Sequence, residues 1–244
     1  MHNLTKIEQH KIIDNSNKWA RANKKRLAKE YIDTDKYLTD KHPVAFFMAG
    51  CPAAGKTEVA RALANNIAKE LKRTEPILHL DPDVIRENIE GYDGSQAELF
   101  QEATTIIVNA CFDRIMKNKP SFILDGTLSN LSITRRNIER CLDHKRKYDI
   151  TLCFVYNDPL VSWQTAQLRK LTTGRDIKLD IFIDRYFKSR ENVNILKSEF
   201  GKRVTLDILF KDLSTADLRP EFNVSSIDNH IPCNYNRDSL KLAI

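Results

Sequence analysis

The sequence lacks the features that mark several classes of protein. Its five cysteines are odd in number and none forms a CxxC pair, so neither a disulfide framework nor a zinc ribbon is indicated and a reducing compartment is favoured. No apolar run approaches the length of a membrane span, and the first residues hold no apolar segment of the signal-peptide kind. We therefore expect a cytoplasmic protein with no membrane partner.

Catalytic signatures are also few. No group of histidines and cysteines has the spacing of metal ligands, and no GxSxG motif or nucleophile triad occurs. Aromatic residues make up only 8% of the chain and form no evident platform for stacking bases. Charge is plentiful, because 39 Lys and Arg against 33 Asp and Glu give a net charge of +6, which favours anionic partners such as nucleotides or nucleic acid.

Short apolar runs alternate with helical patterns through the middle of the chain. Five runs indicate strands, over residues 44–48, 77–80, 121–124, 150–156 and 204–210. Helices are expected over residues 57–71, 95–118, 131–147, 159–171 and 179–200, with Ser95 and Glu98 forming a capping box at the start of the second. Alternating strands and helices predict an α/β fold of three layers around a mainly parallel, five-stranded sheet.

The chain divides into three expected parts. Residues 1–41 are polar and basic with a loose apolar stripe, which indicates a helical N-terminal extension of one or two helices. Residues 42–212 form the α/β domain. Residues 213–244 are rich in Asn and Ser, contain two prolines and show a weak pattern, so we expect a partly ordered tail.

One motif points to phosphate binding. The stretch GCPAAGKT, residues 50–57, matches G-x-x-x-x-G-K-[ST] in full and lies between an expected strand and an expected helix. In such a P-loop, Lys56 lies along the β- and γ-phosphates and Thr57 places its hydroxyl on Mg²⁺. The motif predicts a P-loop NTPase-type domain that binds ATP or GTP with Mg²⁺. The nucleotide would contact Gly50, Cys51, Pro52, Ala53, Ala54, Gly55, Lys56 and Thr57.

A second motif, LDPDVIR, follows the second expected strand. Ligands bind beyond the carboxyl ends of parallel strands, so Asp81 and Asp83 should lie near the P-loop. We assign Asp83 as the base that accepts a hydroxyl proton. Asp81 either caps the helix that begins at Pro82, acts on the acceptor as the base in place of Asp83, or assists the metal. Arg86, one turn beyond Asp83, would hold an anionic acceptor or neutralise the transferring phosphoryl group.

Two further motifs complete the set. ILDGT ends the third expected strand with Asp125, which resembles a Walker B acid and would bind Mg²⁺ or contact the acceptor together with Thr127. AQLRKLTTGRD carries Arg169 and Arg175 where small kinases have a lid. A lid excludes water and its arginines stabilise transition-state charge, so we assign both a catalytic role.

These four motifs, in this order, resemble the zeta toxin family of P-loop kinases over about residues 43–212. The resemblance implies a kinase that uses ATP or GTP with Mg²⁺ to phosphorylate a hydroxyl of a nucleotide sugar such as UDP-N-acetylglucosamine. It also implies the toxin of a bacterial toxin–antitoxin system, with a small antitoxin as partner. By the same resemblance, Asp83 matches the base, and Arg169 and Arg175 match arginines that contact phosphate. Asp125 replaces the usual Glu, and Asn109 replaces another acidic sugar contact; both departures bear on the acceptor.

Two alternatives remain open. A polynucleotide 5′-hydroxyl kinase also has its base in a D-x-x-R element, and the net charge of +6 suits nucleic acid. A nucleotide-binding switch without enzymatic activity would share the P-loop. Asp83 and Arg86 argue against the switch, because a switch needs no acceptor base.

Overall fold

The structure is a computed structural model that describes residues 4–70, 72–73, 75–174, 176–212 and 218–244. A sheet in the order β2-β3-β1-β4-β5-β6 forms its centre. Its strands are β1 (Val44–Ala49), β2 (Leu78–Leu80), β3 (Phe122–Leu124), β4 (Asp149–Tyr156), β5 (Val204–Lys211) and β6 (Leu218–Glu221). The first five run parallel, at the five places that the apolar runs predicted.

The sixth strand was not predicted. β6 pairs antiparallel with β5 at the edge of the sheet, with Pro220 opposite Leu209. Most of its residues are exposed, so it has no continuous apolar run to mark it. Proline is tolerated at an edge because no further strand needs its missing N–H. The sheet therefore has six strands rather than five, and the α/β class stands.

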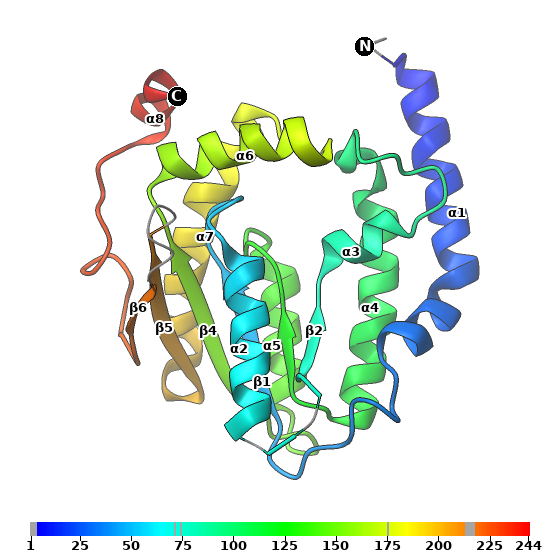
Figure 1. The fold of residues 1–244 in the computed structure, drawn as a ribbon, viewed down its shortest axis with the longest axis vertical. Coiled ribbons are helices and arrows are strands. Elements are labelled where there is room, and N and C mark those ends of the chain that lie inside the picture. The colour runs from blue at the N-terminus through cyan, green and yellow to red at the C-terminus, as the bar shows by residue number, and fades with distance from the viewer. Residues whose placement is uncertain (1–3, 71, 74, 175, 213–217) are drawn as a thin grey trace.

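Helices cover both faces of the sheet, as Figure 1 shows. They are α1 (Lys6–Tyr31), α2 (Lys56–Glu70), α3 (Pro82–Glu87), α4 (Gln101–Asn118), α5 (Leu131–Leu142), α6 (Pro159–Thr173), α7 (Leu179–Phe200) and α8 (Arg237–Ala243), with 3-10 turns at Ala97–Phe100 and Gly201–Arg203. Strand side chains alternate between the two faces. Phe47 packs in one core with Phe112 of α4, whereas the next residue, Met48, packs in a second core with Val59 of α2. The three-layer prediction is confirmed.

The N-terminal extension is one long helix. α1 begins with a capping box between Thr5 and Glu8 and lies along α4, where Ala20, Leu27 and Ala28 are buried (Figure 1). Its contact with α4 is extensive, so the helix is part of the packed structure. No helix among the described residues is long and apolar enough to cross a membrane.

Two helix boundaries differ from the prediction by five residues or more. Ser95 does not cap a helix, because its backbone N–H and its hydroxyl both donate to Asp93, and Glu98 instead binds Lys178. This local Asp–Ser turn competes with helix formation, and α4 begins only at Gln101. α5 ends at Leu142 rather than at residue 147, because Asp143 accepts a hydrogen bond from the N–H of Lys145 and forms a turn.

The parallel strands place the motifs at one edge of the sheet. β1 lies in the centre, between β3 and β4, and the P-loop follows its carboxyl end. Asp81 follows β2 and Asp125 follows β3, and the N–H of Asp125 donates to the carbonyl of Leu80. The carboxyl edge of three neighbouring strands therefore holds three of the predicted motifs.

Candidate functional site

The P-loop has a backbone that only glycine permits at its first residue. Gly50 has a φ of +133° and donates its N–H to the hydroxyl of Ser189 at 2.7 Å. A Cβ atom at this position would lie 2.3 Å from the carbonyl oxygen of Val155 on β4. The loop can therefore pass close to the neighbouring strand only because Gly50 has no side chain.

Lys56, the first residue of α2, is a buried cation with 8% exposure. Its Nζ donates to the carbonyl oxygens of Gly50 at 3.2 Å and Cys51 at 2.5 Å. Burial lowers the pKa of Lys56, the negative charge of Asp125 opposes that shift, and the charge of Arg169 adds to it. Burial also raises the pKa of the Cys51 thiol to about 12, which fits a packing role for this cysteine rather than a reactive one.

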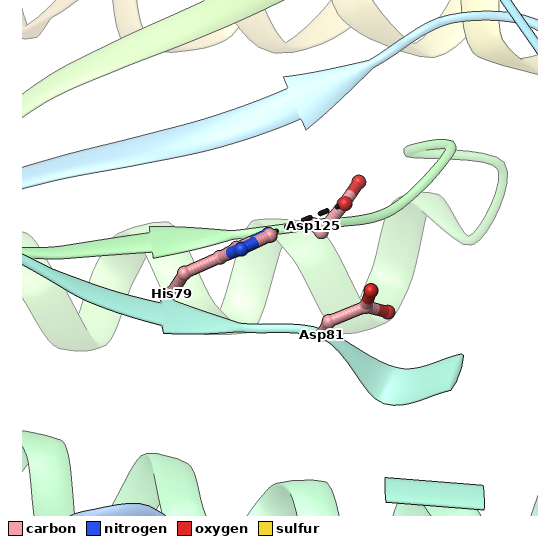
Figure 2. A group of neighbouring side chains, drawn as sticks. All are labelled: His79, Asp81 and Asp125. Carbon is pink, nitrogen blue, oxygen red and sulfur yellow. Dashed lines mark hydrogen bonds and ion pairs between the residues drawn. The ribbon is translucent and has the colours of Figure 1, made fainter. Parts of the chain in front are cut away.

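Asp125 connects the P-loop to β2. Its Oδ2 accepts a hydrogen bond from the Thr57 hydroxyl at 2.9 Å and lies 3.3 Å from Nε2 of His79, as Figure 2 shows for the histidine. Burial alone would raise the pKa of this carboxyl, but the contacts with His79, Lys56 and Thr57 lower it overall. A carboxylate beside the P-loop threonine is the arrangement that a magnesium–nucleotide complex requires.

Helix α3 carries the predicted base. Oδ1 of Asp81 accepts the backbone N–H of Asp83 at 2.8 Å, so Asp81 caps this helix, which is one of the roles that the sequence left open. Arg86 donates to Oδ1 of Asp83 at 2.6 Å and to Oε1 of Gln101 at 3.3 Å. The Asp83 side chain is 49% exposed, whereas Arg86 is 11% exposed. The arginine thus holds a carboxylate that remains accessible.

The lid motif lies at the end of α6. Arg169 donates to Glu58 of α2 at 3.1 Å, and Lys211 of β5 lies 3.7 Å from the same carboxylate. Gly174, with a φ of +72°, ends the helix. Arg175, the second predicted lid arginine, lies outside the described residues. The structure therefore brings Arg169 to the helix that begins in the P-loop.

Two further residues, Thr127 and Asn109, were predicted to contact the acceptor. Thr127 lies in the loop after β3, where its hydroxyl and that of Ser129 are 2.8 Å apart. Asn109 lies in the middle of α4 and is partly buried. None of the hydrogen bonds or ion pairs within the described ranges joins Asn109 to the other site residues, so its role in the acceptor site stays a prediction.

A cavity beside α7 is lined by a cationic side chain that the motifs did not indicate, Arg185. Its volume is about 410 Å³, and it is lined by Ser129 and Asn130 before α5 and by one face of α7 that includes Arg185. Burial lowers the pKa of Arg185, and the negative charge of Asp83 is the strongest opposing influence. Within the described part of the chain, Arg185 makes no hydrogen bond or ion pair. Its sequence neighbours are ordinary helix residues, so no motif could have indicated it.

The P-loop, the buried lysine and the carboxylates at one sheet edge define a P-loop protein of the phosphotransferase class. Residues 28–219 match the model of the family described as Zeta toxin. This match spans most of the chain, so the protein belongs to the zeta toxin family. No curated protein matches the sequence.

Solved structures have the same fold at low identity. A structure of the PezAT chromosomal toxin–antitoxin system of Streptococcus pneumoniae has a TM-score of 0.62 and 14% identity, covering 99% of this chain and 96% of that one. A complex of AvrRxo1-ORF1 and -ORF2 with ATP has a TM-score of 0.58 and 15% identity, covering 94% and 75%. The Pnkp1/Rnl/Hen1 RNA repair complex has a TM-score of 0.50 and 17% identity, covering 81% and 54%.

Proposed function

We propose that this protein is a kinase that transfers the γ-phosphate of ATP or GTP to a hydroxyl group of a small acceptor. The observation that carries this proposal is the pairing of Asp83 with Arg86 at 2.6 Å, at the sheet edge that also holds the P-loop. A protein that only binds nucleotides has no need of an oriented, accessible carboxylate there. Membership of the zeta toxin family supports a phosphotransferase.

The proposed reaction needs a nucleophile, a base and charge neutralisation. The acceptor oxygen attacks the γ-phosphorus in line, its proton passes to Asp83, and the bond from that phosphorus to the β–γ bridging oxygen breaks to release the nucleoside diphosphate. Lys56 would exchange its bonds to the P-loop carbonyls for bonds to phosphate oxygens. Arg169, with Arg175, would neutralise charge and exclude water.

The residues present fit a magnesium ion. Thr57 and Asp125 supply a hydroxyl and a carboxylate 2.9 Å apart beside the P-loop. Oxygen ligands of this kind, with water and phosphate, are what Mg²⁺ takes in phosphoryl-transfer sites. When bound, the ion supplies positive charge to the β- and γ-phosphate oxygens.

The proposed acceptor is a nucleotide sugar such as UDP-N-acetylglucosamine. Arg185 supports an anionic acceptor, because its partly buried guanidinium lines the cavity and makes no ion pair with the described residues. The two aspartates of the lining already have cationic partners, since Asp184 pairs with Lys188 and Arg237, and Asp180 with Lys241. A diphosphate would give this guanidinium the partner that it lacks among the described residues. Asp83 would then face the sugar hydroxyl.

We also propose a toxin role in the cytoplasm with a small antitoxin as partner. Family membership supports it, as does the likeness of fold to a structure from a toxin–antitoxin system. The domain over residues 42–212 would carry the reaction. The N-terminal extension and the tail after residue 212 would complete the packed structure.

A labelling experiment tests the reaction and the acceptor together. Purified protein is incubated with γ-labelled ATP or GTP and, separately, with UDP-sugars, 5′-hydroxyl oligonucleotides and neutral sugars. We expect label on a UDP-sugar alone, and none with Lys56→Ala or Asp83→Asn. Label on oligonucleotides alone would make the protein a polynucleotide kinase, and tight nucleotide binding without any transfer would make it a switch. Growth arrest on expression, relieved by Lys56→Ala, tests the toxin role.

A further inference from the structure

His79, Asp81 and Asp125 form a group of neighbouring side chains at the ends of β2 and β3 (Figure 2). His79 and Asp81 are two residues apart along β2 and its end, so both side chains lie on the same face of the sheet. Asp125 follows β3, whose Ile123 is in register with His79, so it shares that face. One ligand atom from each of the three residues lies within 4.8 Å of the others.

The two carboxylates of this group lie close together, and the nearby charge of Lys56 acts on Asp125 without a direct ion pair. Across the described ranges, no lysine or arginine forms an ion pair with Asp81 or Asp125. Two carboxylates held this close with little solvent repel one another, and a cation between them would relieve that repulsion.

We infer that His79, Asp81 and Asp125 form a binding site for a divalent transition-metal ion such as Mn²⁺, Co²⁺ or Zn²⁺. Nε2 of His79 and Oδ2 of Asp125 are 3.3 Å apart. Two ligands that each lie ~2.1 Å from one ion stand about 3.0 to 3.4 Å apart in octahedral or tetrahedral geometry. The observed distance therefore suits two ligands of the same ion, with Asp81 as the third.

The imidazole of His79 determines which class of metal ion suits the site. Mg²⁺ and Ca²⁺ take oxygen ligands almost exclusively, whereas a nitrogen ligand favours first-row transition metals and zinc. A cavity of about 80 Å³ borders His79 and Asp81 and is also lined by Tyr31, Arg61 and Val84. That space admits water molecules, which would complete the coordination of an ion that has only three protein ligands.

The proposed transition-metal site and the proposed magnesium site use different ligands. The magnesium site uses Thr57 and Asp125 and depends on nucleotide phosphates for its other ligands. The three-residue site shares Asp125 with it but needs no nucleotide. The inference can therefore be tested apart from the proposed kinase reaction, and a failure of one leaves the other standing.

The test is a titration of the nucleotide-free, full-length protein with Co²⁺, followed by visible absorption and by calorimetry. We expect one Co²⁺ per chain, with coordination by nitrogen and oxygen, that an excess of Mg²⁺ does not displace. His79→Leu and Asp81→Asn should each weaken binding at least ~10-fold. Asn retains the capping role of Asp81, so this variant should fold even if His79→Leu does not.

Two control variants make the result specific. His144→Gln removes a histidine whose side chain is 80% exposed, and Cys233→Ser removes an exposed thiol. Both should bind Co²⁺ as the unaltered protein does. The proposal is overturned if no saturable binding occurs, if folded His79→Leu or Asp81→Asn binds normally, if Cys233→Ser abolishes binding, or if Mg²⁺ competes as well as Co²⁺.

Discussion

The guanidinium of Arg86 holds the carboxylate of Asp83 at 2.6 Å, one turn earlier on α3. The same guanidinium reaches Gln101 at the start of α4 at 3.3 Å, so it ties the short helix to a long one. Arg86 is largely buried and Asp83 is half exposed. A fixed arginine thus orients an accessible carboxylate, which is what a base needs in order to meet an acceptor hydroxyl.

Replacement of Asp83 should remove catalysis without unfolding the protein. Asp83→Asn keeps the size of the side chain and an oxygen for Arg86, but it cannot accept a proton. We expect the rate of phosphoryl transfer to fall by ~10²–10⁴-fold, the usual contribution of a general base. Rapid-quench measurement of the first turnover reports the rate, and thermal unfolding checks the fold. Transfer at the normal rate by the Asn variant would show that another group accepts the proton.

Arg185 should determine how tightly the acceptor binds. Arg185→Gln removes a positive charge from the cavity beside α7 and should raise the KM for an anionic acceptor about 10-fold, since a hydrogen bond to a charged group contributes ~1.5 kcal/mol or more. The KM for nucleotide should not change. The matched control is Arg135→Gln, which removes an arginine paired with Glu199 at the surface. Equal effects of the two variants, or a change confined to nucleotide KM, would refute this role.

The sequence predicted the parts of the fold that rest on continuous patterns. Five apolar runs became the five parallel strands, because strands buried on both faces must be apolar throughout. α7 spans Leu179–Phe200, as the periodicity indicated. The P-loop was predicted because its conformation needs particular residues, such as Gly50, at particular places.

The remainder depends on contacts between distant segments. β6 is stabilised by pairing with β5, and its own residues carry no apolar pattern. His79 lies between Leu78 and Leu80 in the sequence, and the partner that matters, Asp125, is 46 residues away. Arg185 of α7 lines its cavity together with Ser129 and Asn130, which lie far earlier in the chain. No local pattern carries that information.

Gly50→Ala should damage stability as well as nucleotide binding. The added methyl group would meet the Val155 carbonyl at 2.3 Å, and the φ of +133° is itself unfavourable for alanine. Strain of this kind costs on the order of 1–3 kcal/mol, which should lower the midpoint of denaturant unfolding. Gly91→Ala is the matched control, since its φ of +84° is also positive but its added Cβ would meet no atom within 4 Å. If the two variants lost the same stability, the contact with Val155 would not matter.

Asp207 should make stability depend on pH. It lies on β5, where burial raises the pKa of its carboxyl above the ordinary 3.8, although a hydrogen bond from the N–H of Asn223 partly opposes the shift. Well below 3.8 the carboxyl is protonated in both the folded and the unfolded protein and has no effect on their balance. As pH rises through the raised folded-state pKa, the folded protein must ionise a partly buried group, and stability is lost.

Asp207→Asn should therefore be more stable than the unaltered protein near neutral pH and no more stable at strongly acidic pH. The amide oxygen can still accept the N–H of Asn223, so the variant removes the ionisation and keeps the hydrogen bond. Melting temperatures across the acidic range measure the difference, with exposed Asp149→Asn on β4 as the control. Only a group whose pKa differs between the folded and unfolded states makes the difference in stability between the two proteins depend on pH. A difference in melting temperature that stayed constant with pH would therefore mean that packing, and not ionisation, distinguishes the variant from the unaltered protein.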